Sequence, residues 1–266
     1  MARRWNLLTL IVVASTVLTG CHLFESHQAS IQRWGGLLSD LRYEWDAEPG
    51  IDILTAAPVP VRAYIESRML AQSMGDLDYA YPGFTRAVPP DPPDAGWGLR
   101  PNVNHSVSRA LIGNARYHIL SLNRSADVVT ATLCNYGYSV AHQVEDAKED
   151  DKFESVARGV ALQPKGIFAE RVTLTAPSDE SAPLPPQAGP SPAPSGDVFG
   201  NWRITGYLFS TSQPGFKSQW PSFDADLAKC VDKAPDPPER RDFLTDGEHP
   251  RSDFPTSPAS PGWPAS

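Results

Sequence analysis

The chain has 266 residues, of which 41% are hydrophobic and 27 are prolines, and its formal net charge is −8. An acidic chain is a poor candidate for nucleic-acid binding, because phosphates need basic partners. It contains no phosphate loop, nucleophile elbow or dinucleotide fingerprint, and its six histidines lack metal-ligand spacing, so we expect no cofactor, no metal and no catalytic motif.

The chain opens with a segment typical of exported proteins. Arg3 and Arg4 precede an apolar run over residues 7–18, which is too short to span a bilayer because spanning takes about 20 apolar residues. Leu18-Thr19-Gly20-Cys21 then resembles the lipobox of bacterial lipoproteins. The resemblance implies that residues 1–20 are a signal peptide and that Cys21 carries diacylglyceryl and further acyl chains such as palmitate. The alternative is an uncleaved signal anchor.

Lipidation at Cys21 would hold the protein on the outer side of the cell membrane. Removal of residues 1–20 takes away two arginines and no acid, so 246 residues with a net charge of −10 would remain. That length suits one domain with tails. Because an acidic surface does not bind anionic lipids by charge, the predicted contact with the membrane depends on the acyl chains.

Two cysteines remain once Cys21 is lipidated. Cys134 and Cys230 form an even pair in a compartment that permits disulfides, so we predict a bond between them. In the chain-entropy model, closing a loop of about 95 residues stabilises the fold by roughly 4–5 kcal/mol. The alternative is two separate buried thiols.

Residues 21–57 read as a tether followed by a short amphipathic helix. Apolar side chains recur there at helical spacing, namely Trp34, Leu37, Leu38, Leu41 and Trp45. Pro49-Gly50 would end the helix. Its apolar face would lie on the domain or on the bilayer interface.

A longer helix is predicted over residues 59–73, with Thr55 as its N-cap and prolines in its first turn. Residues 77–84 continue the apolar pattern as a second short helix or turn. The proline-rich residues 88–101 then form an irregular loop.

From residue 115 the apolar period changes to two, which indicates strands. Expected strands are residues 115–122, 128–136, 155–163, 167–175 and 201–209, with a solvated acidic connection over 145–154 and a helical turn over 223–230. Residues 176–197 form a proline-rich insertion, and residues 231–266 form a disordered proline-rich tail.

Helices followed by antiparallel hairpins predict an α+β fold, with the first helices packed on a bent antiparallel sheet of four or more strands. The stretch 63–84 resembles the opening helices of NTF2-like (cystatin-like cone) domains of actinobacterial envelope proteins. The strand Asn201-Trp202-Arg203-Ile204-Thr205-Gly206-Tyr207 is similar to the last strand of that family. The resemblance implies an NTF2-like domain over residues 58–230.

NTF2-like folds enclose a conical pocket, so polar residues on the strands are candidates to line it. These are His118, Tyr136, Arg158, Glu170 and Trp202. Each has a plainer interpretation: His118 alone on a strand is more often a structural residue, and Arg158 and Glu170 fit a cross-strand ion pair.

Two kinds of function follow from these features. The first is a lipid-anchored, non-enzymatic envelope protein that binds an envelope partner or an apolar small molecule. The second is an NTF2-like enzyme of the dehydratase or isomerase type, with a carrier of apolar ligands as a further alternative. No residue is assigned a catalytic role.

Overall fold

The computed structural model describes residues 31–91, 98–145, 152–159, 164–178, 185–209 and 215–265. All of them belong to one compact unit, residues 31–266. The predicted signal peptide and Cys21 lie outside the described residues. Among those residues, no helix is long and apolar enough to cross a membrane.

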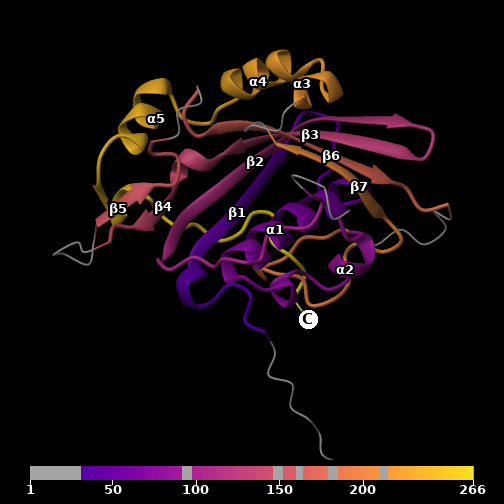
Figure 1. The fold of residues 1–266 in the computed structure, drawn as a ribbon, viewed down its shortest axis with the longest axis horizontal. Coiled ribbons are helices and arrows are strands. Elements are labelled where there is room, and N and C mark those ends of the chain that lie inside the picture. The colour runs from indigo at the N-terminus through magenta and orange to yellow at the C-terminus, as the bar shows by residue number, and fades with distance from the viewer. Residues whose placement is uncertain are drawn as a thin grey trace, which may run out of the picture. The chain divides into compact units, whose positions relative to one another are not determined.

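The unit is built on one eight-stranded sheet (Figure 1). Its strands are β1 (Asp40–Ala47), β2 (Leu111–Ser125), β3 (Val128–Tyr136), β4 (Val140–Gln143), β5 (Lys152–Ser155), β6 (Ile167–Thr175), β7 (Arg203–Phe209) and β8 (His249–Pro250). The order is β7-β6-β3-β2-β4-β5-β8, and β1 pairs with β2. All pairings are antiparallel except β1 with β2. The α+β prediction is therefore confirmed.

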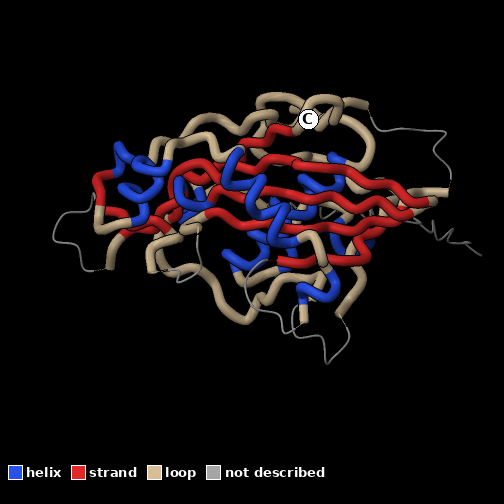
Figure 2. The backbone as a smooth tube through the Cα atoms, turned by 90° about the horizontal axis from the view of Figure 1, so that it is seen from above, coloured by secondary structure: helices blue, strands red, loops and turns tan. Residues whose placement is uncertain are grey.

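Helices lie on both faces of this sheet. They are α1 (Pro58–Met74), α2 (Phe84–Ala87), α3 (Phe216–Gln219), α4 (Phe223–Asp232) and α5 (Pro238–Thr245), with short 3-10 turns at Gly36–Leu38, Leu77–Tyr79, Gly137–Ser139 and Arg251–Asp253. Figure 1 shows α1 and α2 on one side of the strands and α3 to α5 on the other. The long strands run side by side through the molecule (Figure 2).

Strand alternation divides the core into two clusters, because successive side chains point to opposite faces. On β3, Val129, Ala131 and Leu133 belong to the cluster under α1. Cys134 and Tyr136 belong to the cluster under α4 and α5. The disulfide between Cys134 and Cys230 joins β3 to α4 inside the second cluster, as predicted.

The predicted helix over residues 59–73 is confirmed as α1, but its start differs. The N-cap is Ala57 rather than Thr55, whose hydroxyl bonds to Asp52 instead. Pro58 occupies the first turn, where a missing N–H costs nothing. Gly75 ends the helix with φ +67°, a left-handed conformation that glycine adopts without strain.

The predicted amphipathic helix around residues 34–45 is wrong. These residues form a 3-10 turn and then β1, where Leu41, Tyr43 and Trp45 are buried on alternate positions. Parallel pairing with the central strand β2 supplies their backbone hydrogen bonds. The aromatic side chains stack on Tyr117 of β2, with ring centroids 5.7 Å and 4.7 Å away for Tyr43 and Trp45.

The predicted strand over residues 155–163 is also wrong. The strand β5 covers only Lys152–Ser155, a turn follows at 156–159, and residues 160–163 lie outside the described residues. Because β5 pairs with β4 and β8, it forms no hairpin with β6. The other predicted strands are confirmed as β2, β3, β6 and β7, and the turn at 223–230 is part of α4.

The tail predicted to be disordered is folded over its described residues, 231–265. Phe254 and Trp263 are each 1% exposed, and α5 and β8 lie within the segment. Ser260 pairs with the open edge of β1: its N–H donates to the carbonyl of Tyr43, and its carbonyl accepts from the N–H of Trp45. This pairing covers a strand edge that would otherwise be exposed.

Within the proline-rich insertion, the described residues 185–197 are likewise packed rather than free. Ser191 pairs with Trp263, and Gln187 is buried. The insertion and the C-terminal segment both contact α1, which explains why Arg62 and Glu66 of this helix are buried.

Arg62 and Glu66 of α1 form the hydrogen bonds that hold these two segments against the helix. Arg62 donates to the carbonyls of Gln187, Pro261 and Gly262, and its guanidinium lies 4.4 Å from the centre of the Trp263 ring. The Glu66 carboxylate accepts from the indole N–H groups of Trp45 (2.8 Å) and Trp263 (2.9 Å) and from the hydroxyl of Tyr81 (2.6 Å). Burial raises the pKa of Glu66, while Arg62 and these donors act in the opposite direction.

Candidate functional site

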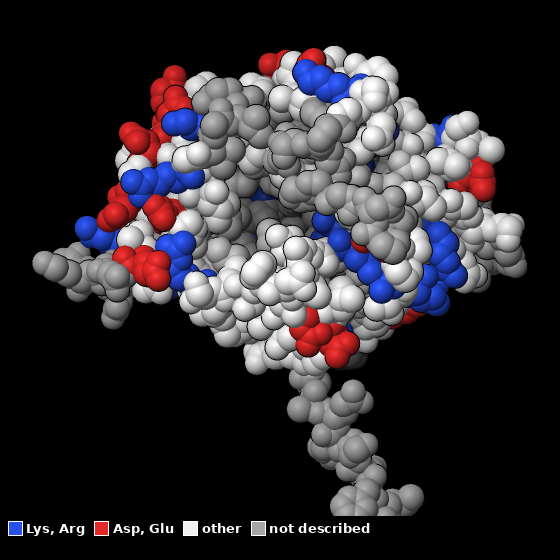
Figure 3. All heavy atoms as spheres, in the orientation of Figure 1, with Lys and Arg blue, Asp and Glu red and all other residues white. Residues whose placement is uncertain are grey.

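A cavity of about 670 Å3 lies between α1, the α1-facing side of the sheet and residues 102–111. Its size falls within the range of about 300–1,000 Å3 that is typical of small-molecule sites. Its lining is mixed, with apolar side chains from Ile65, Met69, Val107, Leu111, Val156 and Phe209. The face drawn in Figure 3 is hollowed near its centre.

Glu170 of β6 provides the one acidic side chain among the described residues of this lining. Its carboxylate is 1% exposed and is held by three neighbouring strands. Asn135 of β3 donates at 2.7 Å, Tyr117 of β2 at 3.2 Å and Tyr207 of β7 at 3.0 Å. Asn135 also donates to the Tyr117 hydroxyl at 2.8 Å, so the four side chains form one network.

Burial shapes the ionisation of this network. It raises the pKa of Glu170, because a carboxylate loses hydration in the interior, while the hydrogen bonds from Asn135, Tyr207 and Tyr117 act against this. Burial next to Glu170 also raises the pKa values of Tyr117 and Tyr207 well above the ordinary value for tyrosine. Both phenols are therefore uncharged donors at neutral pH.

Tyr43 of β1 brings an unpaired polar group to the same lining. Its hydroxyl is buried and has no hydrogen-bond partner among the described residues. Leaving such a group unpaired costs about 1–3 kcal/mol, so a native structure that keeps one calls for an explanation. A ligand atom in the cavity would supply the partner.

Arg68 of α1 lies over the Tyr207 ring, with its guanidinium carbon 4.3 Å from the ring centre. Its Nη1 donates to the carbonyls of Gly98 and Leu99, which ties the 98–101 loop to the helix. Arg68 therefore places a fixed positive charge beside the cavity.

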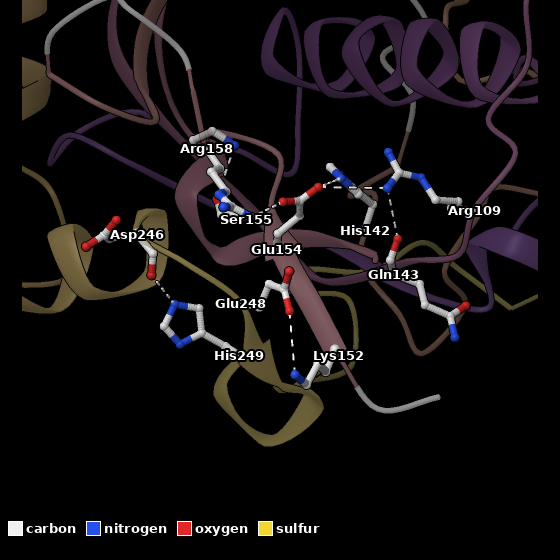
Figure 4. A network of polar contacts seen from close by, with 11 residues as sticks. Arg109, His142, Gln143, Lys152, Glu154, Ser155, Arg158, Asp246, Glu248 and His249 are labelled. Atoms are coloured by element: carbon white, nitrogen blue, oxygen red, sulfur yellow. Dashed lines mark hydrogen bonds and ion pairs between the residues drawn. The ribbon is translucent and has the colours of Figure 1, made fainter. Parts of the chain in front are cut away.

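A second polar network borders the cavity at β4 and β5 (Figure 4). His142 lies 2.7 Å from Glu154, and Arg109 lies 3.8 Å from it and donates to the carbonyl of Gln143 at 3.2 Å. Arg158 pairs with the other oxygen of Glu154. Burial acts to raise the pKa of Glu154, but the hydrogen bonds with His142 and Arg158 act in the opposite direction, and the pKa is lowered overall. Arg109 and His142 line the cavity, whereas Glu154 lies behind them.

Of the five side chains predicted to line a pocket, only Glu170 lines this cavity. Tyr136 faces the second cluster, where its hydroxyl donates to the carbonyl of Cys230. Arg158 is exposed and pairs with Glu154, so the predicted ion pair with Glu170 is wrong. Trp202 packs against the first cluster without reaching the lining.

His118 lies on the opposite face of β2 from Tyr117 and the cavity, as strand alternation requires. Its Nδ1 is 2.8 Å from Asp46 and its Nε2 is 3.3 Å from Glu48. The hydrogen bond with Asp46 raises the pKa of His118, against the effect of burial. The residue therefore joins β2 to the end of β1, which is the structural role that a lone histidine most often has.

No motif or spacing in the sequence marked Tyr43, Arg68, Asn135 or Tyr207 as site residues. Tyr43, Asn135 and Tyr207 meet through the strand order β7-β6-β3-β2-β1, and Arg68 joins them because α1 packs on this face of the sheet. The one usable signal was Glu170 itself, a carboxylate that shares a strand face with the apolar residues Phe168 and Val172.

Comparison with known proteins returns nothing for this chain. No protein-family model, no curated protein and no solved structure matches it. Within the described ranges, no group of three or more histidine, cysteine, aspartate or glutamate side chains is placed to hold a metal ion. The site must therefore be interpreted from its own geometry.

Proposed function

We propose that this protein is a lipid-anchored envelope protein whose α+β domain binds a small, largely apolar molecule. The cavity of about 670 Å3, which contains the buried Glu170 network and the unpaired hydroxyl of Tyr43, carries the proposal. Its apolar walls would hold the body of the ligand, and the few polar groups would orient one end. A helix laid against the inner side of the sheet, with a cavity between them, also supports an NTF2-like cone.

Binding of a neutral apolar probe tests the cavity. We expect N-phenyl-1-naphthylamine to bind the exported chain carrying Cys21→Ser, with a rise in fluorescence. Ser108 lines the cavity and is exposed, so Ser108→Trp should fill the cavity and weaken binding at least about tenfold. The matched control is Ser125→Trp, at the exposed end of β2. Equal binding by both variants would place the probe elsewhere.

The anchor is tested separately, at Cys21. Because at least two acyl chains are needed for stable attachment, Cys21→Ser should move the protein from the membrane fraction to the soluble fraction. Cell fractionation followed by mass analysis of the N-terminus measures this. Retention of the variant in the membrane fraction would count against lipidation.

An enzymatic role is the second candidate, and the raised pKa of Glu170 beside Tyr207 favours it. The two roles differ in what happens to a bound molecule. A binding protein returns its ligand unchanged. An enzyme would convert it, and Glu170→Gln would then abolish conversion while leaving binding in place.

A further inference from the structure

One cation in the lining of the cavity, Arg68, has no ion-pair partner among the described residues. Arg109 also lines the cavity but is offset by Glu154, 3.8 Å away, and Glu170 is the one acid among the described lining residues. The chain as a whole carries −8. A concave site with low-dielectric walls concentrates the field of the charges that line it. Arg68 therefore gives this acidic protein a positively charged point in the cavity at which an anionic group can bind.

The charges of Glu170 and Arg68 attract each other, but no ion pair within 4.0 Å and no hydrogen bond joins the two side chains. Glu170 takes its hydrogen bonds from Asn135, Tyr117 and Tyr207. Among the described residues, every hydrogen bond of Arg68 leaves from Nη1. Its Nε and Nη2 have no hydrogen-bond partner in the described ranges, and this edge of a guanidinium matches the two oxygens of a carboxylate.

Arg68 is held in one orientation before any ligand arrives. Its Nη1 is fixed on the carbonyls of the 98–101 loop, and the Tyr207 ring supports one face of the guanidinium. A donor that is already ordered loses less entropy on binding than a flexible one. The unpaired hydroxyl of Tyr43 adds a further donor in the same lining.

Resting on the function proposed above, we propose that the ligand is an amphipathic carboxylic acid, such as a fatty acid. Its carboxylate pairs with the Nε and Nη2 edge of Arg68, and its hydrocarbon chain lies along the apolar side chains of the cavity.

The test compares cis-parinaric acid with its methyl ester, on the exported chain carrying Cys21→Ser. The two probes share the same chain and differ in the charged group. We expect the acid to bind at least about tenfold more tightly than the ester, since the ester cannot form the charge-assisted pair. Equal affinity for acid and ester would overturn the inference, whereas binding of N-phenyl-1-naphthylamine would still support the cavity. Failure of all three probes would remove the proposed function as well.

The variant Arg68→Gln tests whether the preference for the acid over the ester depends on Arg68. It should bring the affinities for acid and ester to within about twofold of each other. The matched control is Arg100→Gln, because Arg100 also ties its loop to backbone carbonyls, those of Thr85 and Val88, but does not line the cavity. This control should keep the preference for the acid. A folded Arg68→Gln protein that still prefers the acid would contradict the role of Arg68. If that variant does not fold, the comparison of acid and ester on the protein with an unaltered cavity still decides the ligand class.

Discussion

Replacement of Trp263 by alanine is expected to lower the free energy of unfolding by about 3–5 kcal/mol, the usual cost of removing a buried tryptophan. The indole is 1% exposed, donates to Glu66 and lies against Arg62. Its loss leaves a cavity and takes one donor from a buried carboxylate. Urea denaturation followed by circular dichroism measures the change.

Two further variants separate the contributions of Trp263. Trp263→Phe keeps an aromatic ring but removes the N–H, and a hydrogen bond to a charged group contributes about 1.5–3 kcal/mol. The free energy of unfolding of this variant should therefore lie between those of the native protein and the alanine variant. Phe243→Ala, at an aromatic residue that is 46% exposed, should change stability by less than about 1 kcal/mol. If Trp263→Ala cost no more than this control, the C-terminal segment would not be part of the core.

Loss of the disulfide is the second large effect. The double variant Cys134→Ala and Cys230→Ala should be less stable by about 4–5 kcal/mol, because the bond closes a loop with a sequence separation of 96 and so restricts the unfolded chain. Both residues are buried, and alanine avoids placing a hydroxyl in their apolar surroundings. The midpoint of urea denaturation, compared with that of the native protein, gives the difference.

Reduction of the native protein provides the control for this variant. Under a reducing agent, the native protein should show the stability of the double alanine variant, and the variant itself should not respond. A native protein whose unfolding is the same with and without the reducing agent would indicate two free thiols at these positions, which was the alternative that the sequence left open.

Local patterns in the sequence predicted most of the regular elements. The helix α1 and the strands β2, β3, β6 and β7 have long, clear periodicity, and the parity of the cysteines led to the correct disulfide. The region 34–45 failed because its apolar residues fit both periods: Leu38, Leu41 and Trp45 are spaced for a helix, while Leu41, Tyr43 and Trp45 alternate as in a strand. Only the pairing with β2, some 70 residues later, decides between them.

The segments predicted to be disordered failed for a different reason. Composition describes the average character of a segment, whereas a small number of individual contacts hold the segment 185–197 and the C-terminal segment in place. Trp263 and Phe254 are almost fully buried, and Arg62 binds backbone carbonyl groups, which every residue has regardless of its side chain. Composition cannot register a contact of that kind.

The candidate site was the least predictable part. Glu170 was identified, but its expected partner Arg158 belongs to a turn outside the cavity. His118 and Tyr136 were on the correct strands and the wrong face, because the sequence alone did not show which face carries α1. Had the face been known, the prediction would have moved by one residue along each strand, to Tyr117 and Asn135, which line the cavity.

The bond between Trp263 and Glu66 joins residues 197 positions apart, and Ser260 completes the edge of the first strand. The N-terminal strand and helix are therefore left without these contacts until almost the whole polypeptide has been synthesised. Contacts this distant in sequence form late, which keeps the emerging chain incompletely folded and within reach of proteases and chaperones. An affinity tag fused after Trp263 would meet the same constraint, so a tag placed between Cys21 and the first strand should disturb the protein less.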